Sequence, residues 1–256
     1  ADEKERAEAA AKLATEQKAQ AEENLKAAQV ATAKANAATI EAQRSAQQVA
    51  SALERGELIR SGLESYRRED YASARDAFER LEEKLRSLQP NANTTQNFTP
   101  AQAKQVVRDY GWTMSRLGAT YHKLHDFDKA ITDYEQARVI LEKLLQDEPA
   151  TIVFETYHGL AHAYHDNATE LTAGQQPSGT TVGYSASEQL AKAEEYYKKA
   201  VAYQQRIRSD NPLLTLTSLK NLAQLYLDIG RYDDAERSLK SVVDIYKTVE
   251  YHPGEG

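Results

Sequence analysis

The chain has 256 residues, of which 28% are charged, and its 32 basic and 39 acidic side chains give a formal net charge of −7. Because there is no basic excess to release counterions from phosphates, this is not the composition of a general nucleic-acid-binding protein. The absence of cysteine excludes disulfides, thiolate zinc sites and cysteine nucleophiles. No apolar run reaches the roughly 18 residues that a membrane span requires, and we expect a cytoplasmic protein.

The first predicted element is a long helix over residues 1–56. Residues 1–55 contain no glycine or proline and include 19 alanines, mixed mainly with Glu, Gln, Lys and Arg, a composition that favours helix. One continuous helix of this length would extend about 80 Å. Its few large apolar residues do not recur at heptad spacing: Leu13, Leu25, Val30, Ile40, Val49 and Leu53. A helical spacer, a homo-oligomerising coiled coil and a partner-binding helix all remain open interpretations of this segment.

Four windows after residue 56 share one pattern. A small residue is followed by an aromatic residue, by an alanine twelve positions after the small residue, and by an aromatic residue or leucine four positions later. The pattern occurs in "GLESYRREDYASARDAFERL" from Gly62, "LGATYHKLHDFDKAITDYEQA" from Leu117 and "LAQLYLDIGRYDDAERSLKSV" from Leu222. The third copy is split into "LAHAY" from Leu160 and "AKAEEYYKKA" from Ala191. We predict an insert over residues 166–186, where Gly, Ser, Thr and Pro are frequent.

This pattern resembles the tetratricopeptide repeat, and the long spacing between Ala193 and Ala235 resembles the kinesin-light-chain type of that repeat. The resemblance implies an all-α fold, an α-solenoid of about four helix-turn-helix repeats after the long helix. We expect the solenoid over residues 57–249, with repeats near 57–90, 109–146, 153–208 and 215–249. Residues 250–256 are a predicted tail, truncated before a further repeat, because Pro253 follows Pro212 at the spacing of one repeat.

Thr99 and Pro100 lie between the first and second repeats. They have the residue types preferred at the N-cap and at the first position of a helix. We therefore predict that the second repeat's first helix begins there.

The stretch "TYHGLAHAYHDN", residues 156–167, holds three histidines at spacings of four and three. On a helix, His158, His162 and His165 share one face with Glu155. In the repeat register, the tyrosine, leucine and alanine residues between them take buried positions. The resemblance then places the histidines on the side that lines the concave groove of this family.

The residue pattern argues against a metal-binding or catalytic role for these histidines. The zinc-protease signature requires a glutamate directly after the first histidine, where this chain has Gly159. Four ligands in one helical row cannot surround one ion as a tetrahedron, and a groove offers a general base no enclosed pocket. We therefore expect no metal, no cofactor and no enzymatic activity.

The same register positions in every repeat predict a partner-binding surface. Its basic residues would pair with carboxylates, its amides would bind a peptide backbone, and its tryptophan would be an aromatic anchor. Charging of the histidines would strengthen binding of an acidic ligand as pH falls through about 6.5. The predicted residues are Arg60, Arg67, Trp112, Arg116, Lys123, His158, His162, His165, Lys220, Asn221 and Gln224.

The resemblance thus implies a non-enzymatic protein–protein interaction scaffold. It would bind an extended or acidic partner segment and form one region of a larger, bacterial, signalling or regulatory protein. Two alternatives remain open: an architectural oligomerisation module with no peptide ligand, in which residues 1–56 form the homo-oligomer, and a metal-binding sensor that uses the histidine stripe.

Overall fold

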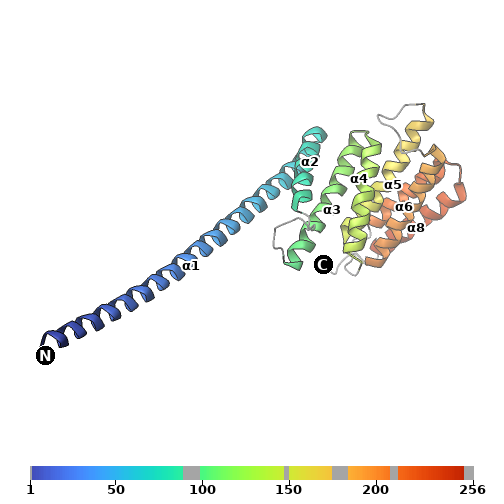
Figure 1. The fold of residues 1–256 in the computed structure, drawn as a ribbon. Coiled ribbons are helices and arrows are strands. Elements are labelled where there is room, and N and C mark those ends of the chain that lie inside the picture. Colours follow the sequence, from blue (N-terminus) through green and yellow to red (C-terminus); the bar gives the residue numbers. More distant parts are fainter. Residues whose placement is uncertain (1, 89–98, 147–149, 175–183, 208–212, 251–256) are drawn as a thin grey trace. The chain divides into compact units, whose positions relative to one another are not determined.

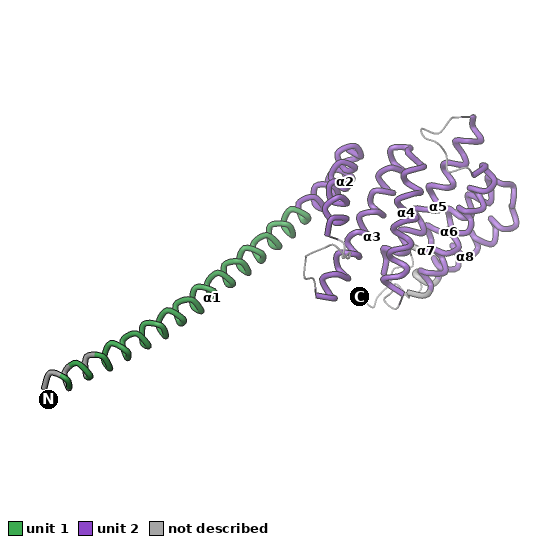
Figure 2. Tube along the Cα trace, viewed as in Figure 1, with its two compact units in different colours: residues 1–56 green, residues 57–256 purple. Residues whose placement is uncertain are grey.

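The computed structural model describes residues 2–88, 99–146, 150–174, 184–207 and 213–250, and every regular element within these ranges is an α-helix (Figure 1). The chain divides into two compact units, residues 1–56 and residues 57–256 (Figure 2). The second unit begins with residues 57–67, which are the end of the first helix.

Helix α1 (Asp2–Arg67) is continuous over 66 residues, which confirms the predicted long helix. Its residues 11–50 are all exposed, and the large apolar side chains among them are at least half exposed. Alanine and the straight-chain polar residues keep this segment helical through local propensity, because it buries no apolar stripe.

The second unit consists of helix pairs. The end of α1 precedes α2 (Tyr71–Leu88), and then come α3 (Pro100–Lys123), α4 (Phe127–Leu144), α5 (Thr151–Thr172), α6 (Ala186–Ile207), α7 (Leu213–Asp228) and α8 (Tyr232–Glu250). From α2 onward each helix packs against the next, and α3 also packs against α5 (Figure 1). The end of α1 with α3, α5 and α7 are the first helices of four repeats, and α2, α4, α6 and α8 are the second helices. This arrangement is the predicted α-solenoid.

Three of the repeats turn at equivalent positions. Glu69, His125 and Gly230 each lie five residues before the repeat alanine, and their φ angles are 62°, 59° and 75°. A residue in this left-handed region ends a helix and reverses the chain. The second helix then begins at once, and the two helices of a repeat lie antiparallel.

The predicted start of α3 is confirmed. Thr99 is the N-cap, with its side chain accepting from the amide of Gln102, whose own side chain accepts from the Thr99 amide. Pro100 occupies the first turn. These reciprocal bonds satisfy amides that the helix itself cannot.

The predicted insert of the third repeat begins later than expected, because α5 continues through Thr172. Residues 175–183 of that insert lie outside the described residues, as do residues 251–256 of the predicted tail.

The core follows the repeat pattern. The repeat alanines Ala74, Ala130, Ala193 and Ala235 are at most 1% exposed, because the two helices of a repeat approach closely at that position. One apolar cluster runs from Leu58 to Ala235, and Leu216, Leu219 and Val242 form a second cluster in the last repeat. The rigid stacking of these layers positions the side chains of the first helices.

Candidate functional site: a hollow on the first-helix face

A hollow of about 340 Å³ lies on the face formed by the first helices of the repeats. Tyr66 from the end of α1 lines it on one side, and Thr217 of α7 lines it on the other. Between them, α3 supplies Arg116, His122 and Lys123, and α5 supplies Phe154, Glu155, His158 and His162. Four of the predicted binding residues thus share one hollow: Arg116, Lys123, His158 and His162.

The floor of the hollow exists because two glycines leave room for one aromatic ring. A Cβ atom on Gly118 of α3 would come within 2.7 Å of the Tyr134 ring, and one on Gly159 of α5 within 2.3 Å. Tyr134 is 5% exposed. Helices α3 and α5 therefore approach across this tyrosine, and their polar side chains surround the space above it.

Arg116 is held at the wall of the hollow. Its guanidinium pairs with the carboxylate of Glu155 on α5, and it also lies 5.3 Å from the centroid of the Trp112 ring. The partner carboxylate neutralises much of the arginine charge, because the two groups are in direct contact. Arg116 therefore contributes shape and hydrogen-bond donors more than net positive charge.

Trp112, the predicted aromatic anchor, lies at the contact between two repeats. It is half-buried and packs edge-to-face on the buried Phe78 ring, at a centroid distance of 6.0 Å. The tryptophan contributes to the contact between the first and second repeats.

The histidine stripe connects the third repeat to the fourth. His158 Nδ1 lies 2.9 Å from Ser218 Oγ, and the Asn221 amide donates to His162 Nε2 at 2.7 Å. His165, which is 7% exposed, places its Nε2 atom 3.0 Å from an Asp228 carboxylate oxygen. Each histidine of α5 therefore contacts one polar side chain of α7, in the order of the stripe.

An equivalent contact joins the second repeat to the third. His122 Nε2 of α3 lies 2.8 Å from Asp166 Oδ2 of α5. The rings of His122 and His162 lie 6.1 Å apart, and those of His158 and His162 lie 4.8 Å apart. The imidazoles thus form a continuous row across α3 and α5 and reach α7 through their hydrogen bonds.

Two of these histidines are neutral at ordinary pH. Burial, with a smaller contribution from His162, lowers the pKa of His158 to about 3. Burial also lowers the pKa of His162 to about 4, although Asp166 acts in the opposite direction. The expectation that these side chains gain charge near pH 6.5 is therefore wrong for His158 and His162.

The geometry of the row does not assemble a metal site. Within the described ranges, no group of three or more histidine, aspartate or glutamate side chains converges where it could hold an ion. The bond that His162 Nε2 accepts from Asn221 also occupies the lone pair that a metal would need.

The remaining predicted residues lie outside the hollow. Arg60, Arg67, Lys220 and Gln224 are exposed, and Gln224 donates to Asp228 Oδ1 at 2.8 Å. Trp112, His165 and Asn221 belong to contacts between repeats. The residues that line the hollow without having been predicted include Tyr134, Phe154 and Gly159. Gly159 could have been found, because an unexplained glycine in a helix marks a close approach.

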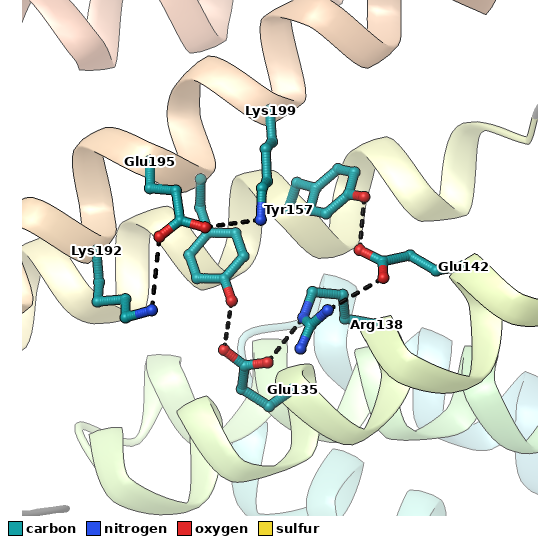
Figure 3. Close-up of polar contacts among 8 residues, drawn as sticks. Glu135, Arg138, Glu142, Tyr157, Lys192, Glu195 and Lys199 are labelled. Carbon is teal, nitrogen blue, oxygen red and sulfur yellow. Dashed lines mark hydrogen bonds and ion pairs between the residues drawn. The ribbon is translucent and has the colours of Figure 1, made fainter.

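A separate polar network joins helices α4, α5 and α6 (Figure 3). The Tyr157 hydroxyl donates to Glu142 at 2.6 Å, and the Tyr196 hydroxyl donates to Glu135 at 2.6 Å. Arg138 lies between the two glutamates and donates to both. All three charged groups are thereby satisfied by one another, which indicates a role in holding α4, α5 and α6 together.

Two segments of the chain match family models described as the tetratricopeptide repeat, residues 111–150 and residues 183–248. These two segments are therefore tetratricopeptide repeats, as the repeat pattern predicts, and repeats of this kind are scaffolds for protein–protein interaction. No curated protein matches the chain. Within the described residues, no helix is long and apolar enough to cross a membrane.

Three solved structures are among those similar to the chain. One is a crystal structure of a Podosopora anserina putative kinesin light chain with nearly identical TPR-like repeats, at 19% identity, covering 78% of this chain and 96% of that one, with a TM-score of 0.32. Its Q17M variant covers 95% of that chain with the same identity and TM-score. Another is BtubC (BKLC) from P. vanneervenii, at 16% identity over 80% of this chain and 95% of that one, with a TM-score of 0.29.

Proposed function

We propose that the repeat unit binds an extended, acidic segment of a partner protein across the hollow on the first-helix face. The proposal rests on one observation, the exposed and unpaired state of Lys123 among the described residues. This lysine lines the hollow and is exposed, and it takes part in none of the ion pairs that the described residues form.

A contrast with the second helices α6 and α8 supports this reading. On α6 and α8, Lys198, Lys199 and Lys240 each pair with a glutamate four residues earlier. On the first helices, Arg60, Arg67, Lys123 and Lys220 are exposed and make no ion pair with any described residue. A protein of net charge −7 thus leaves several cations of its first helices available to a ligand's carboxylates.

The other residues that line the hollow are compatible with a peptide that carries both polar and apolar side chains. Tyr66, which is half-buried, offers aromatic surface, while His158 and His162 are neutral and repel neither sign of charge. One such module binds with a Kd on the order of 1 μM, about −8 kcal/mol.

The test is a set of labelled peptides of about 12 residues, acidic, neutral and basic, titrated by fluorescence anisotropy against the whole chain. We expect the acidic peptides to bind most tightly. Lys123→Glu should weaken them about tenfold, and raising the salt concentration should weaken them as well.

Lys143→Glu is the matched control, because Lys143 is an exposed lysine on the second helix α4 that pairs with no described residue. It changes the net charge equally, and we expect it to change affinity little. Equal effects of the two substitutions, or equal binding of all three peptide classes, would refute the proposal.

A further inference from the structure

The Tyr134 hydroxyl has no hydrogen-bond partner among the described residues. This tyrosine of α4 is 5% exposed, and it lines the hollow on the first-helix face. A buried phenol usually finds a hydrogen-bond partner, because a bond left unmade in a dry site costs free energy. An unpartnered hydroxyl at the floor of a candidate binding site therefore requires an explanation.

Other tyrosines of the helix pairs show which acceptor this chain uses. Several donate to a glutamate carboxylate of another helix at 2.6–3.0 Å: Tyr110, Tyr157, Tyr196 and Tyr226. Helix α5 has Gly159 beside the Tyr134 hydroxyl, where a Cβ atom would lie 2.4 Å from the hydroxyl oxygen. Glu155, whose charge acts on Tyr134, is paired with Arg116. A carboxylate for Tyr134 must therefore come from a ligand.

The equivalent tyrosine of the next repeat differs in one respect. Tyr197 of α6 lies four residues after Ala193, as Tyr134 lies four residues after Ala130. The Tyr197 hydroxyl also has no partner among the described residues, but it is fully enclosed. The His162 ring lies over it, at a centroid distance of 5.6 Å. Tyr134 instead lines the hollow, so a ligand that fills the hollow can reach it.

The charges around Tyr134 favour an acceptor that is itself negative. Burial raises the pKa of Tyr134, so the hydroxyl keeps its proton at ordinary pH and can donate it. Among the residues that line the hollow, Arg116 and Glu155 neutralise each other. Lys123 lies five residues after Gly118 on α3, about 7.5 Å along the helix axis, and supplies positive charge. A carboxylate over Tyr134 would gain a charge-assisted hydrogen bond and the attraction of Lys123.

We propose that the Tyr134 hydroxyl donates a hydrogen bond to a carboxylate of the partner segment, so that the hollow receives one inserted aspartate or glutamate side chain. This assignment rests on the proposed function and makes it more specific, because one acidic position is recognised and not only overall charge. Gly118 and Gly159 allow it, since the tyrosine ring reaches the hollow between α3 and α5 only where both helices lack a Cβ atom.

The test is an anisotropy titration of the labelled acidic peptide against the whole chain, Tyr134→Phe and Tyr197→Phe. We expect Tyr134→Phe to weaken binding about tenfold, because it removes a hydrogen bond to a charged acceptor. Tyr197→Phe is the matched control, since it removes the enclosed hydroxyl at the same repeat position, and it should leave affinity unchanged. Neither substitution removes a hydrogen bond between described residues, so we expect both variants to fold, and urea unfolding checks this.

Replacing each acidic residue of the peptide by alanine in turn locates the inserted carboxylate. For one peptide position, Tyr134→Phe should then change affinity less than about twofold, because the bond that it removes is already lost. A loss that persists with every such peptide would overturn the proposal, because the acceptor would be a main-chain carbonyl. Equal effects of Tyr134→Phe and Tyr197→Phe would also overturn it. If Lys123→Glu weakens the acidic peptide and Tyr134→Phe does not, this inference fails and the proposed function stands. Without any preference for acidic peptides, both fail.

Discussion

At the scale of single residues, the glycines beside Tyr134 determine how closely two repeats approach. A Cβ atom on Gly159 would lie 2.3 Å from the tyrosine ring, which is buried and cannot move aside. We expect Gly159→Ala to lower the free energy of unfolding by about 1–3 kcal/mol, the cost of overpacking a core, although alanine is the better helix former.

Urea unfolding measures this change, and Gly56→Ala is the control. Gly56 lies in helix α1 with open space around its Cβ position, so alanine there should stabilise the chain by up to about 1 kcal/mol through its higher helix propensity. Equal responses at the two glycines would show that helix propensity, and not the approach to Tyr134, decides the effect.

The buried histidines make stability depend on pH. The pKa values of His158 and His162 in the folded chain are about 3 and about 4, whereas an unfolded histidine titrates near about 6.5. The unfolded chain therefore binds more protons between about pH 6.5 and pH 4. The stability that the folded chain gains from keeping these two histidines neutral is fully present above about pH 6.5. It is lost as pH falls from about 6.5 to about 4.

Chemical denaturation at pH 7 and at pH 5 measures the loss, and the parent chain must be compared with a histidine variant because burial raises the pKa of Asp133 to about 7, within the same interval. We expect the variant with His158→Gln and His162→Gln to lose less stability than the parent chain, since glutamine can still hydrogen-bond Ser218 and Asn221 without titrating. If the variant loses as much stability between pH 7 and pH 5 as the parent chain does, the lowered pKa values of His158 and His162 are contradicted.

At the scale of helices, paired tyrosines and carboxylates join successive repeats. Tyr196 of α6 donates to Glu135 of α4, which also pairs with Arg138 (Figure 3). Tyr110 of α3 makes the corresponding kind of bond to the buried Glu82 of α2. These bonds satisfy carboxylates that burial would otherwise penalise.

A double-mutant cycle of Tyr196→Phe and Glu135→Gln isolates one such bond. We expect a coupling free energy of about 1–2 kcal/mol, because the acceptor is charged and partly buried. The exposed pair Lys199–Glu195 in the same view is the comparison, and its coupling should stay below about 0.5 kcal/mol. Similar couplings in both cycles would remove the distinction between a repeat junction and a surface ion pair.

Helix α1 differs from the others because it is helical without covering a core. Its large apolar residues from Leu13 to Leu53 are exposed and irregularly spaced. Such spacing does not give two copies a continuous seam, so the structure adds no observation that favours oligomerisation through residues 1–56.

At the scale of the whole molecule, the sequence predicted the repeats well because their packing rules are local. The four repeat alanines are buried as their spacing requires, and the cap at Thr99 could be identified from two adjacent residues. The face of His158, His162 and His165 on α5 followed from helix periodicity alone.

The partners of those side chains could not be predicted in the same way. Ser218, Asn221 and Asp228 lie about sixty residues later in the chain, and their contact with α5 depends on how far successive repeats rotate and approach. The lowered pKa values arise from the burial that this approach creates, so a spacing in the sequence could not reveal them. For the same reason, the contact of the Trp112 ring with Phe78 could not be predicted from the sequence.

The central proposal is that a cation in the hollow on the first helices selects a carboxylate of a partner segment, and a charge-swap titration tests it most directly. Anisotropy is measured for the acidic peptide and for its lysine-substituted counterpart, each against the parent chain and Lys123→Glu, with Lys143→Glu as control. We predict that Lys123→Glu lowers the affinity for the acidic peptide about tenfold and raises the affinity for the lysine-substituted peptide. Lys143→Glu should change neither affinity. Loss of the acidic peptide without a gain by the substituted one, or the same pattern with Lys143→Glu, would contradict the account.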